Sequence, residues 1–150
     1  MEREIPIDPI LEKGYNVRLL EDDFEGLIEK WSSWSKDFRA NADSSLNCQY
    51  SDGEKDKLDI FRCGKPNAPL FIFVHGGYWQ RGDKSVYSFV AESFVNSGID
   101  VAIIGYQLCP DASMTNIVEK IRKAIIWIWS NADDYSISKH RINVSGHSAG

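Results

Sequence analysis

The chain has 150 residues, of which 43% are hydrophobic and 26% are charged, a composition typical of one globular domain with a sizeable core. Its 22 acidic and 17 basic residues give a net charge of −5, which disfavours nucleic acid and anionic membranes as partners, because both require basic patches. The sequence does not open with a secretory pattern, and its apolar runs are too short to span a bilayer, so we expect a cytoplasmic protein. The three cysteines lack C-x-x-C spacing and are expected to be reduced thiols.

Two segments precede the part of the chain that we expect to form a sheet. Residues 1–22 are polar and contain two prolines, and we predict an irregular N-terminal arm there, ahead of a domain over residues 23–150. Apolar residues from Phe24 to Phe38 recur at three- and four-residue steps, which predicts an amphipathic helix capped by one of the two aspartates before it.

The rest of the chain alternates between strand and helix patterns. Leu46–Tyr50 and Leu58–Arg62 flank turn residues and predict an antiparallel pair of strands. Three buried strands separated by two helices are expected to follow, with strands over Leu70–Val74, Val101–Ile104 and Arg141–Val144 and helices over residues 86–94 and 114–128. Short connections between them predict right-handed crossovers and a parallel sheet, so the fold class is α/β, an antiparallel pair followed by a parallel βαβαβ unit.

The third parallel strand runs into Gly146-His147-Ser148-Ala149-Gly150, a G-x-S-x-G motif. This pattern is typical of a nucleophile elbow, a strained strand-to-helix turn that exposes a serine hydroxyl for acyl transfer. Glycine fits at positions 146 and 150, because side chains there would collide with the adjacent strand and helix. The motif predicts that Ser148 is a catalytic nucleophile, whereas the alternative is an ordinary serine in a glycine-rich turn.

A second motif, His75-Gly76-Gly77-Tyr78-Trp79, follows the first parallel strand. Backbone N–H groups of such a loop, together with the N–H after the nucleophile, can hold the negative charge that develops on a carbonyl oxygen during acyl transfer. We therefore expect an oxyanion hole built from Gly76, Gly77 and Ala149. Tyr78 and Trp79 are expected either to border a pocket for a flat aromatic substrate or to pack in the core.

The two motifs, together with Tyr106-Gln107-Leu108-Cys109-Pro110, resemble the kynurenine formamidase (arylformamidase) family of α/β-hydrolases over roughly residues 45–150. The resemblance implies an α/β-hydrolase fold and hydrolysis of N-formyl-L-kynurenine, a small aromatic formamide, to kynurenine and formate in cytosolic tryptophan catabolism. It implies no metal and no organic cofactor, and we expect neither; a homodimer is a further expectation. The roles implied are nucleophile for Ser148, oxyanion hole for Gly76, Gly77 and Ala149, substrate pocket for Tyr78 and Trp79, and structural motif positions for His75, Gly146 and Gly150.

In that family the acid and the base follow the elbow, and this sequence ends at Gly150. His147 neighbours the serine, but adjacent side chains diverge on leaving a strand, and His140 should lie about 26 Å away at the other end of the third parallel strand. We therefore expect the N-terminal half of an α/β-hydrolase, truncated after the nucleophile elbow and inactive alone. A short isoform and a half completed by a second chain are the alternatives for its length. A carboxylesterase for other aryl or acyl esters, or a catalytically silent binding partner, are the alternatives for its function.

Overall fold

The computed structural model describes residues 6–19 and 21–150. The chain divides into two compact units, Met1–Lys30 and Trp31–Gly150. The boundary between them falls inside one helix. The first unit contains α1 (Pro9–Tyr15), the short 3₁₀ helix η1 (Val17–Leu19) and the start of α2 (Phe24–Asn41). The second contains the rest of α2 and all five strands.

The prediction of an irregular arm over residues 1–22 was wrong for its central part, where α1 forms; residues 1–5 and 20 lie outside the described residues. Asp8 caps α1, because its carboxylate accepts hydrogen bonds from the backbone N–H groups of Ile10 (2.8 Å) and Leu11 (3.2 Å). Pro9 occupies the first helical position, where its missing N–H costs nothing. An aspartate followed by proline was therefore the signal that the sequence analysis missed.

The second unit is built on one mixed sheet of five strands in the order β1-β2-β4-β3-β5. The strands are β1 (Ser44–Gln49), β2 (Lys57–Phe61), β3 (Leu70–Val74), β4 (Asp100–Ile104) and β5 (Ile142–Gly146). β1 and β2 form the predicted antiparallel pair, and β2 also runs antiparallel to β4. β3 is parallel to β4 on one side and to β5 on the other, which confirms the parallel crossovers expected from the sequence.

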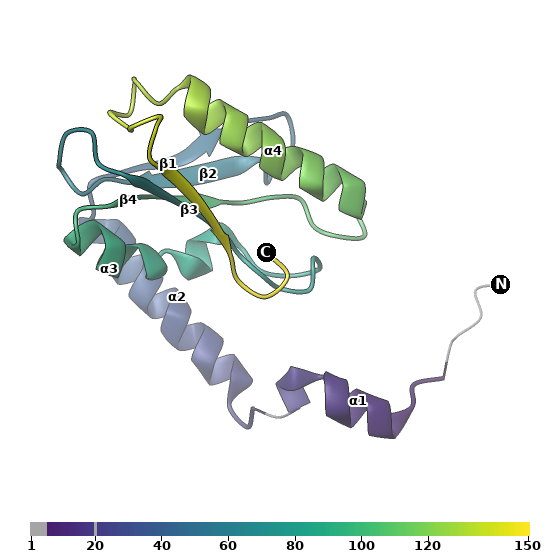
Figure 1. Cartoon of the computed structure of the whole chain (residues 1–150). Helices are drawn as coiled ribbons and strands as arrows, with labels where there is room; N and C mark the ends of the chain where they lie inside the picture. The colour runs from purple at the N-terminus through teal and green to yellow at the C-terminus, as the bar shows by residue number, and fades with distance from the viewer. Residues whose placement is uncertain (1–5, 20) are drawn as a thin grey trace. The chain divides into compact units, whose positions relative to one another are not determined.

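Helices cover both faces of this sheet (Figure 1). α4 (Met114–Ser130), capped by Ser113, packs Ile117, Ala124 and Ile128 onto one face. α3 (Val90–Asn96) and the second half of α2 pack on the opposite face, where Phe61, Phe73 and Val101 point into a separate apolar cluster. The sheet is therefore the middle layer of three, as α/β architecture requires.

The predicted helix over residues 86–94 is broken into η2 (Lys84–Tyr87) and α3. The interruption has a specific cause in Ser35 of α2, which is 1% exposed. Its hydroxyl donates to Val86 O (2.7 Å) and accepts from Phe89 N (3.0 Å), so these backbone groups bond to α2 instead of continuing one helical ladder.

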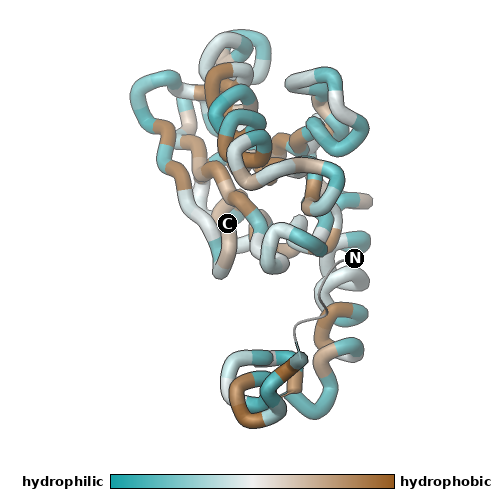
Figure 2. The backbone as a smooth tube through the Cα atoms, turned by 90° about the vertical axis from the view of Figure 1, so that its right-hand side faces the viewer, coloured by the Kyte–Doolittle hydropathy of each residue, from teal (hydrophilic) through white to brown (hydrophobic). Residues whose placement is uncertain are grey.

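The described sheet is unevenly covered. All five residues of β4 are buried, whereas β5 is paired on one side only and exposes 54% of Val144. Figure 2 shows hydrophobic segments running through the part of the chain that holds the sheet, with many hydrophilic segments between them. Cys48, Cys63 and Cys109 are free thiols, as predicted. No helix among the described residues combines the length and the apolar character that crossing a membrane requires.

Candidate active site

The elbow after β5 has a strained backbone. Ser148 adopts a φ of 56°, a left-handed conformation that a side chain normally avoids, and it is exposed at the surface. His147 N donates to Val74 O at 3.1 Å, and Gly150 N donates back to His147 O at 2.9 Å, so the turn is tied to the end of β3 and closed on itself. This is the sharp, raised turn that the G-x-S-x-G motif predicts.

The flanking glycines leave no room for a side chain. A Cβ atom added to Gly146 would lie 2.3 Å from Gly150 O, and one added to Gly150 would lie 2.2 Å from Val74 O. Both distances are far below van der Waals contact. The sequence argument for glycine at these two positions therefore has a direct steric basis.

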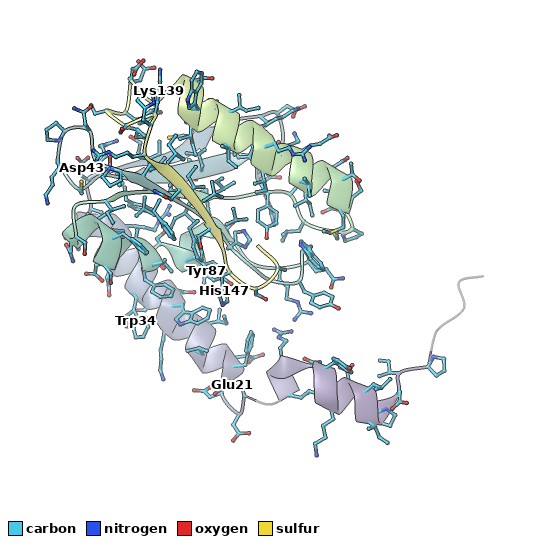
Figure 3. All side chains as sticks on the ribbon, viewed as in Figure 1. Glu21, Trp34, Asp43, Tyr87, Lys139 and His147 are labelled. Atoms are coloured by element: carbon cyan, nitrogen blue, oxygen red, sulfur yellow. The ribbon has the colours of Figure 1, made fainter. Side chains whose placement is uncertain are left out.

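The loop after β3 lies against the elbow. A Cβ atom added to Gly76 would lie 2.9 Å from Ser148 Cβ, 2.6 Å from His147 O and 3.4 Å from Ala149 N. The two motifs are 70 residues apart in the sequence and meet at the same edge of the sheet, where Figure 3 labels His147 in the turn after β5. The structure thus brings Gly76, Ser148 and Ala149 together at the carboxyl ends of β3 and β5.

Several backbone donors in this region are unused by the protein. Among the described residues, the amides of Gly76, Gly77 and Ala149 form no hydrogen bond to another protein group. Gly77 has a φ of 127°, and a Cβ atom there would lie 2.0 Å from Arg81 O, so only glycine fits. Unpaired, fixed N–H groups beside a serine hydroxyl are what an oxyanion hole requires.

His75 is 1% exposed and lies between two parallel aromatic rings. Its ring centroid is 4.4 Å from that of Tyr106 and 5.4 Å from that of Tyr87, with interplanar angles of 13° and 12°. Nδ1 donates to Gly76 O at 2.7 Å. Burial, the largest cause, lowers the pKa of His75 below its usual value, so the ring is neutral near pH 7, and its Nδ1 proton holds the loop through Gly76 O.

Tyr78 and Trp79, the two residues predicted at a pocket mouth, differ in burial although their ring centroids lie 5.5 Å apart. Both have positive φ values, 56° and 58°. Tyr78 is 72% exposed, whereas Trp79 is half-buried and packs against the core beneath α4. Trp79 O also accepts a hydrogen bond from Cys109 N at 2.8 Å, which fastens this loop to the segment after β4. Tyr78 therefore lies at the surface, whereas Trp79 contributes to packing.

The described residues place no base beside Ser148. Within residues 6–19 and 21–150, no side chain hydrogen-bonds Ser148 Oγ, and no group of three or more His, Cys, Asp or Glu is arranged to hold a metal ion. His147 is exposed, and His140 precedes β5 at the opposite end of that strand. A cavity of about 500 Å³ lies between α2 and α3, and one of about 300 Å³ is lined by His75 and Tyr106, but Ser148 lines neither. Ser148 is exposed and therefore stands on an open surface.

Tyr106 also contributes to the site. The sequence predicted no role for it and singled it out only as part of a motif. Tyr106 follows β4, is 2% exposed, and donates its hydroxyl to His75 O at 2.6 Å. Its position just after a parallel strand was an available signal, because such positions gather at the ligand-binding edge of the sheet.

Comparison with known proteins agrees with this geometry. Over 114 residues the chain is 32% identical to a kynurenine formamidase from Salmo salar, covering 75% of this chain and 37% of that protein. A kynurenine formamidase from Drosophila melanogaster is 34% identical over 104 residues, covering 68% of this chain and 34% of that protein. The chain thus spans little more than a third of the length of these two relatives.

Solved structures show the same architecture. A protein from Silicibacter sp. TM1040, described as a candidate thioesterase, superposes with a TM-score of 0.82 at 32% identity, covering 93% of this chain and 52% of that one. Esterase B from Lactobacillus rhamnosis has a TM-score of 0.68 at 21% identity, covers 87% of this chain and 47% of the other, and shares the fold. The family model BD-FAE matches residues 58–150, the segment that contains both motifs. The chain has the α/β-hydrolase fold and belongs to the BD-FAE family.

Proposed function

We propose that this chain carries the nucleophile and oxyanion hole of a serine hydrolase of the formamidase type, whose substrate is N-formyl-L-kynurenine. The observation that supports the proposal most is the close approach of the two motifs, where a Cβ atom on Gly76 would lie only 2.9 Å from Ser148 Cβ. Relatives named kynurenine formamidase support the choice of substrate.

The reaction follows from the positions of these groups. Ser148 Oγ attacks the formyl carbon of the substrate, and the carbonyl oxygen becomes an oxyanion that accepts hydrogen bonds from the free amides of Gly76, Gly77 and Ala149. The C–N bond then breaks, the aryl amine leaves with a proton, and a formyl group remains on Ser148. Water hydrolyses that ester, which releases formate and restores the serine hydroxyl. The base that first takes the serine proton, and later returns it to the amine, is supplied by a group other than the described residues.

A carboxylesterase for aryl or acyl esters is the second candidate, since the same nucleophile and oxyanion hole serve both ester and formamide carbonyls. The chain is 30% identical over 106 residues to esterase LipC from Mycobacterium tuberculosis, covering 67% of this chain and 26% of that protein. The two candidates differ in the leaving group, because an amine must be protonated as it leaves whereas an aryl oxide leaves readily.

A chimera tests the proposal. This chain replaces the matching segment of the Salmo salar relative, so that the remainder of that protein supplies the groups that follow the elbow. We expect the chimera to release kynurenine from N-formyl-L-kynurenine, and Ser148→Ala to reduce kcat by about 10⁴-fold or more, because no other group can form the acyl-enzyme. Circular dichroism of both proteins establishes that they are folded.

The outcomes are distinct. A folded chimera that cleaves aryl esters but not the formamide favours the carboxylesterase, and one that cleaves neither contradicts both enzyme assignments. The chain alone is expected to show no turnover, since no described side chain contacts Ser148 Oγ. Turnover by the chain alone that disappears in Ser148→Ala would overturn that expectation.

A further inference from the structure

The loop after β3 has two consecutive carbonyl groups held by side chains. Tyr106 Oη donates to His75 O at 2.6 Å, and His75 Nδ1 donates to Gly76 O at 2.7 Å. In a trans peptide unit the carbonyl and the following N–H point in opposite directions within one plane. Fixing His75 O therefore fixes the N–H of Gly76, and fixing Gly76 O fixes the N–H of Gly77.

Tyr106 acts on both of these peptide units. Its hydroxyl holds the first carbonyl directly, and its ring stacks on the His75 ring that holds the second, with centroids 4.4 Å apart. The side chain is 2% exposed, so water cannot compete for the bond to His75 O. Burial, the largest cause, raises the pKa of Tyr106 to about 12, so the hydroxyl remains a donor throughout the working range of such enzymes.

We propose that Tyr106 is a positioning residue that aims the amides of Gly76 and Gly77 at the space in front of Ser148. This inference rests on the proposed function for its catalytic meaning, whereas the orientation of the two amides can be measured without any activity. Loss of the Tyr106 hydroxyl frees the peptide unit between His75 and Gly76 to rotate, and the amides then sample directions that do not meet an oxyanion.

The molecule offers a matched control in Tyr87. Its ring stacks on the opposite face of His75 at 5.4 Å and is also buried, but among the described residues its hydroxyl forms no hydrogen bond. Tyr106→Phe and Tyr87→Phe each remove one hydroxyl and keep the ring, but only Tyr106→Phe removes a hydrogen bond to His75 O. A general effect of losing the hydroxyl from a ring stacked on His75 would appear in both.

The primary measurement is NMR on the purified chain. His75-Gly76 is the only His-Gly pair and Gly76-Gly77 the only Gly-Gly pair in the sequence. Carbonyl-¹³C histidine with ¹⁵N-glycine therefore selects the Gly76 amide, and carbonyl-¹³C,¹⁵N-glycine selects the Gly77 amide. We expect Tyr106→Phe to broaden or double both signals, while Tyr87→Phe leaves both unchanged. Unaltered Gly76 and Gly77 signals in a folded Tyr106→Phe chain, or equal changes in Tyr87→Phe, would overturn the proposal.

Kinetics of the active chimera give the second measurement. We expect Tyr106→Phe to lower kcat about tenfold or more while KM changes less than about twofold, because the amides act on the transition state more than on the bound substrate. If the amide signals change but kcat does not, the orientation of the Gly76 and Gly77 N–H groups does not affect the rate. That result would also overturn the proposal. If the unsubstituted chimera is inactive, the proposed function fails, and the NMR result alone decides the role of Tyr106 in the loop.

Discussion

At the scale of single residues, the candidate site concentrates backbone strain. Tyr78, Trp79 and Ser148 all have φ values between 56° and 58°, in the left-handed region that residues with a side chain avoid. Such conformations persist only where the surroundings leave no alternative. Here the close approach of Gly76 to the elbow and the hydrogen bond between His147 N and Val74 O supply that constraint.

Replacing Ser148 by glycine should therefore stabilise the chain. Glycine adopts a φ of 56° without steric cost, so we expect Ser148→Gly to increase the free energy of unfolding by about 1 kcal/mol, as measured by urea denaturation. Ser148→Ala keeps the Cβ atom and should give no such increase. Equal stability of the glycine and alanine variants would show that the elbow is not strained.

The buried His75 predicts a dependence of stability on pH. Burial lowers the pKa of His75 in the folded chain below the 6.5 of the unfolded chain, so the unfolded state binds the proton first as pH falls. Stability is complete above about pH 6.5 and is lost as the pH falls towards the folded pKa. Denaturation between about pH 7 and pH 5 should show this loss, and His75→Asn, which keeps a side-chain N–H donor but does not titrate there, should reduce it. An identical pH dependence in both proteins would contradict the assignment.

At the scale of elements, the sequence predicted best where one local pattern decides the structure. β3 matches its predicted bounds because a continuous apolar run between Pro69 and His75 is typical of a buried strand. β1 begins two residues earlier than predicted and contains a bulge with Asn47 at a φ of 58°. Asn47 N donates to Asp59 Oδ1 at 2.7 Å, a contact 12 residues away in the chain, so its cause lies in tertiary structure. The break before α3, made by Ser35, has the same kind of origin.

Asp59 joins three elements through charge. Its side chain is fully buried in β2 and forms ion pairs with Arg39 of α2 and with Lys84 of η2, whose Nζ lies 2.7 Å from Asp59 Oδ1. Lys84→Met removes one partner and leaves the carboxylate with less compensation, and we expect a loss of about 3 kcal/mol in the free energy of unfolding.

The control for this variant is an exposed pair of the same chemistry. Lys139 lies 2.7 Å from Asp133, which is 82% exposed, and Lys139→Met should change the free energy of unfolding by less than about 1 kcal/mol. Thermal or urea unfolding of both variants gives the comparison. A cost for Lys84→Met as small as that for Lys139→Met would show that Arg39 alone satisfies Asp59.

At the scale of the whole molecule, one set of exposed apolar residues lies on β5 and α4, in addition to those of residues 7–19. Ile126 and Trp129 of α4 are 63% and 55% exposed, and Val144 of β5 is 54% exposed. Exposed apolar residues beside an unpaired strand edge favour association between copies. The homodimer expected from the sequence remains a prediction, and this is the surface on which we expect self-association.

A single charge on this surface should therefore oppose association. We expect Ile126→Lys to lower the weight-average mass in sedimentation velocity at high protein concentration without lowering the melting temperature, because the side chain is already exposed. Leu46→Lys, at the opposite edge of the sheet in β1 and 39% exposed, is the control and should leave association unchanged. Equal effects of the two variants would indicate association without a preferred surface.

The sequence also predicted much of the candidate site, because both motifs follow parallel strands and such loops meet at one edge. The sequence could not predict the side-chain contacts that support these two loops. The stacking of His75 between Tyr87 and Tyr106, and the hydrogen bond from Tyr106, depend on how three loops approach one another in space. The difference in burial between Tyr78 and Trp79 likewise accompanies positive φ values that no spacing rule encodes.

The two glycines of the elbow limit which amino acids this turn can accept. Gly146 is confined by Gly150 O, and Gly150 by Val74 O, so enlarging one residue cannot be compensated by any change in the other, because both obstacles are main-chain atoms. His147 between them is exposed. A saturation library selected for folding should therefore recover only glycine in codons 146 and 150, and a broad range of amino acids in codon 147.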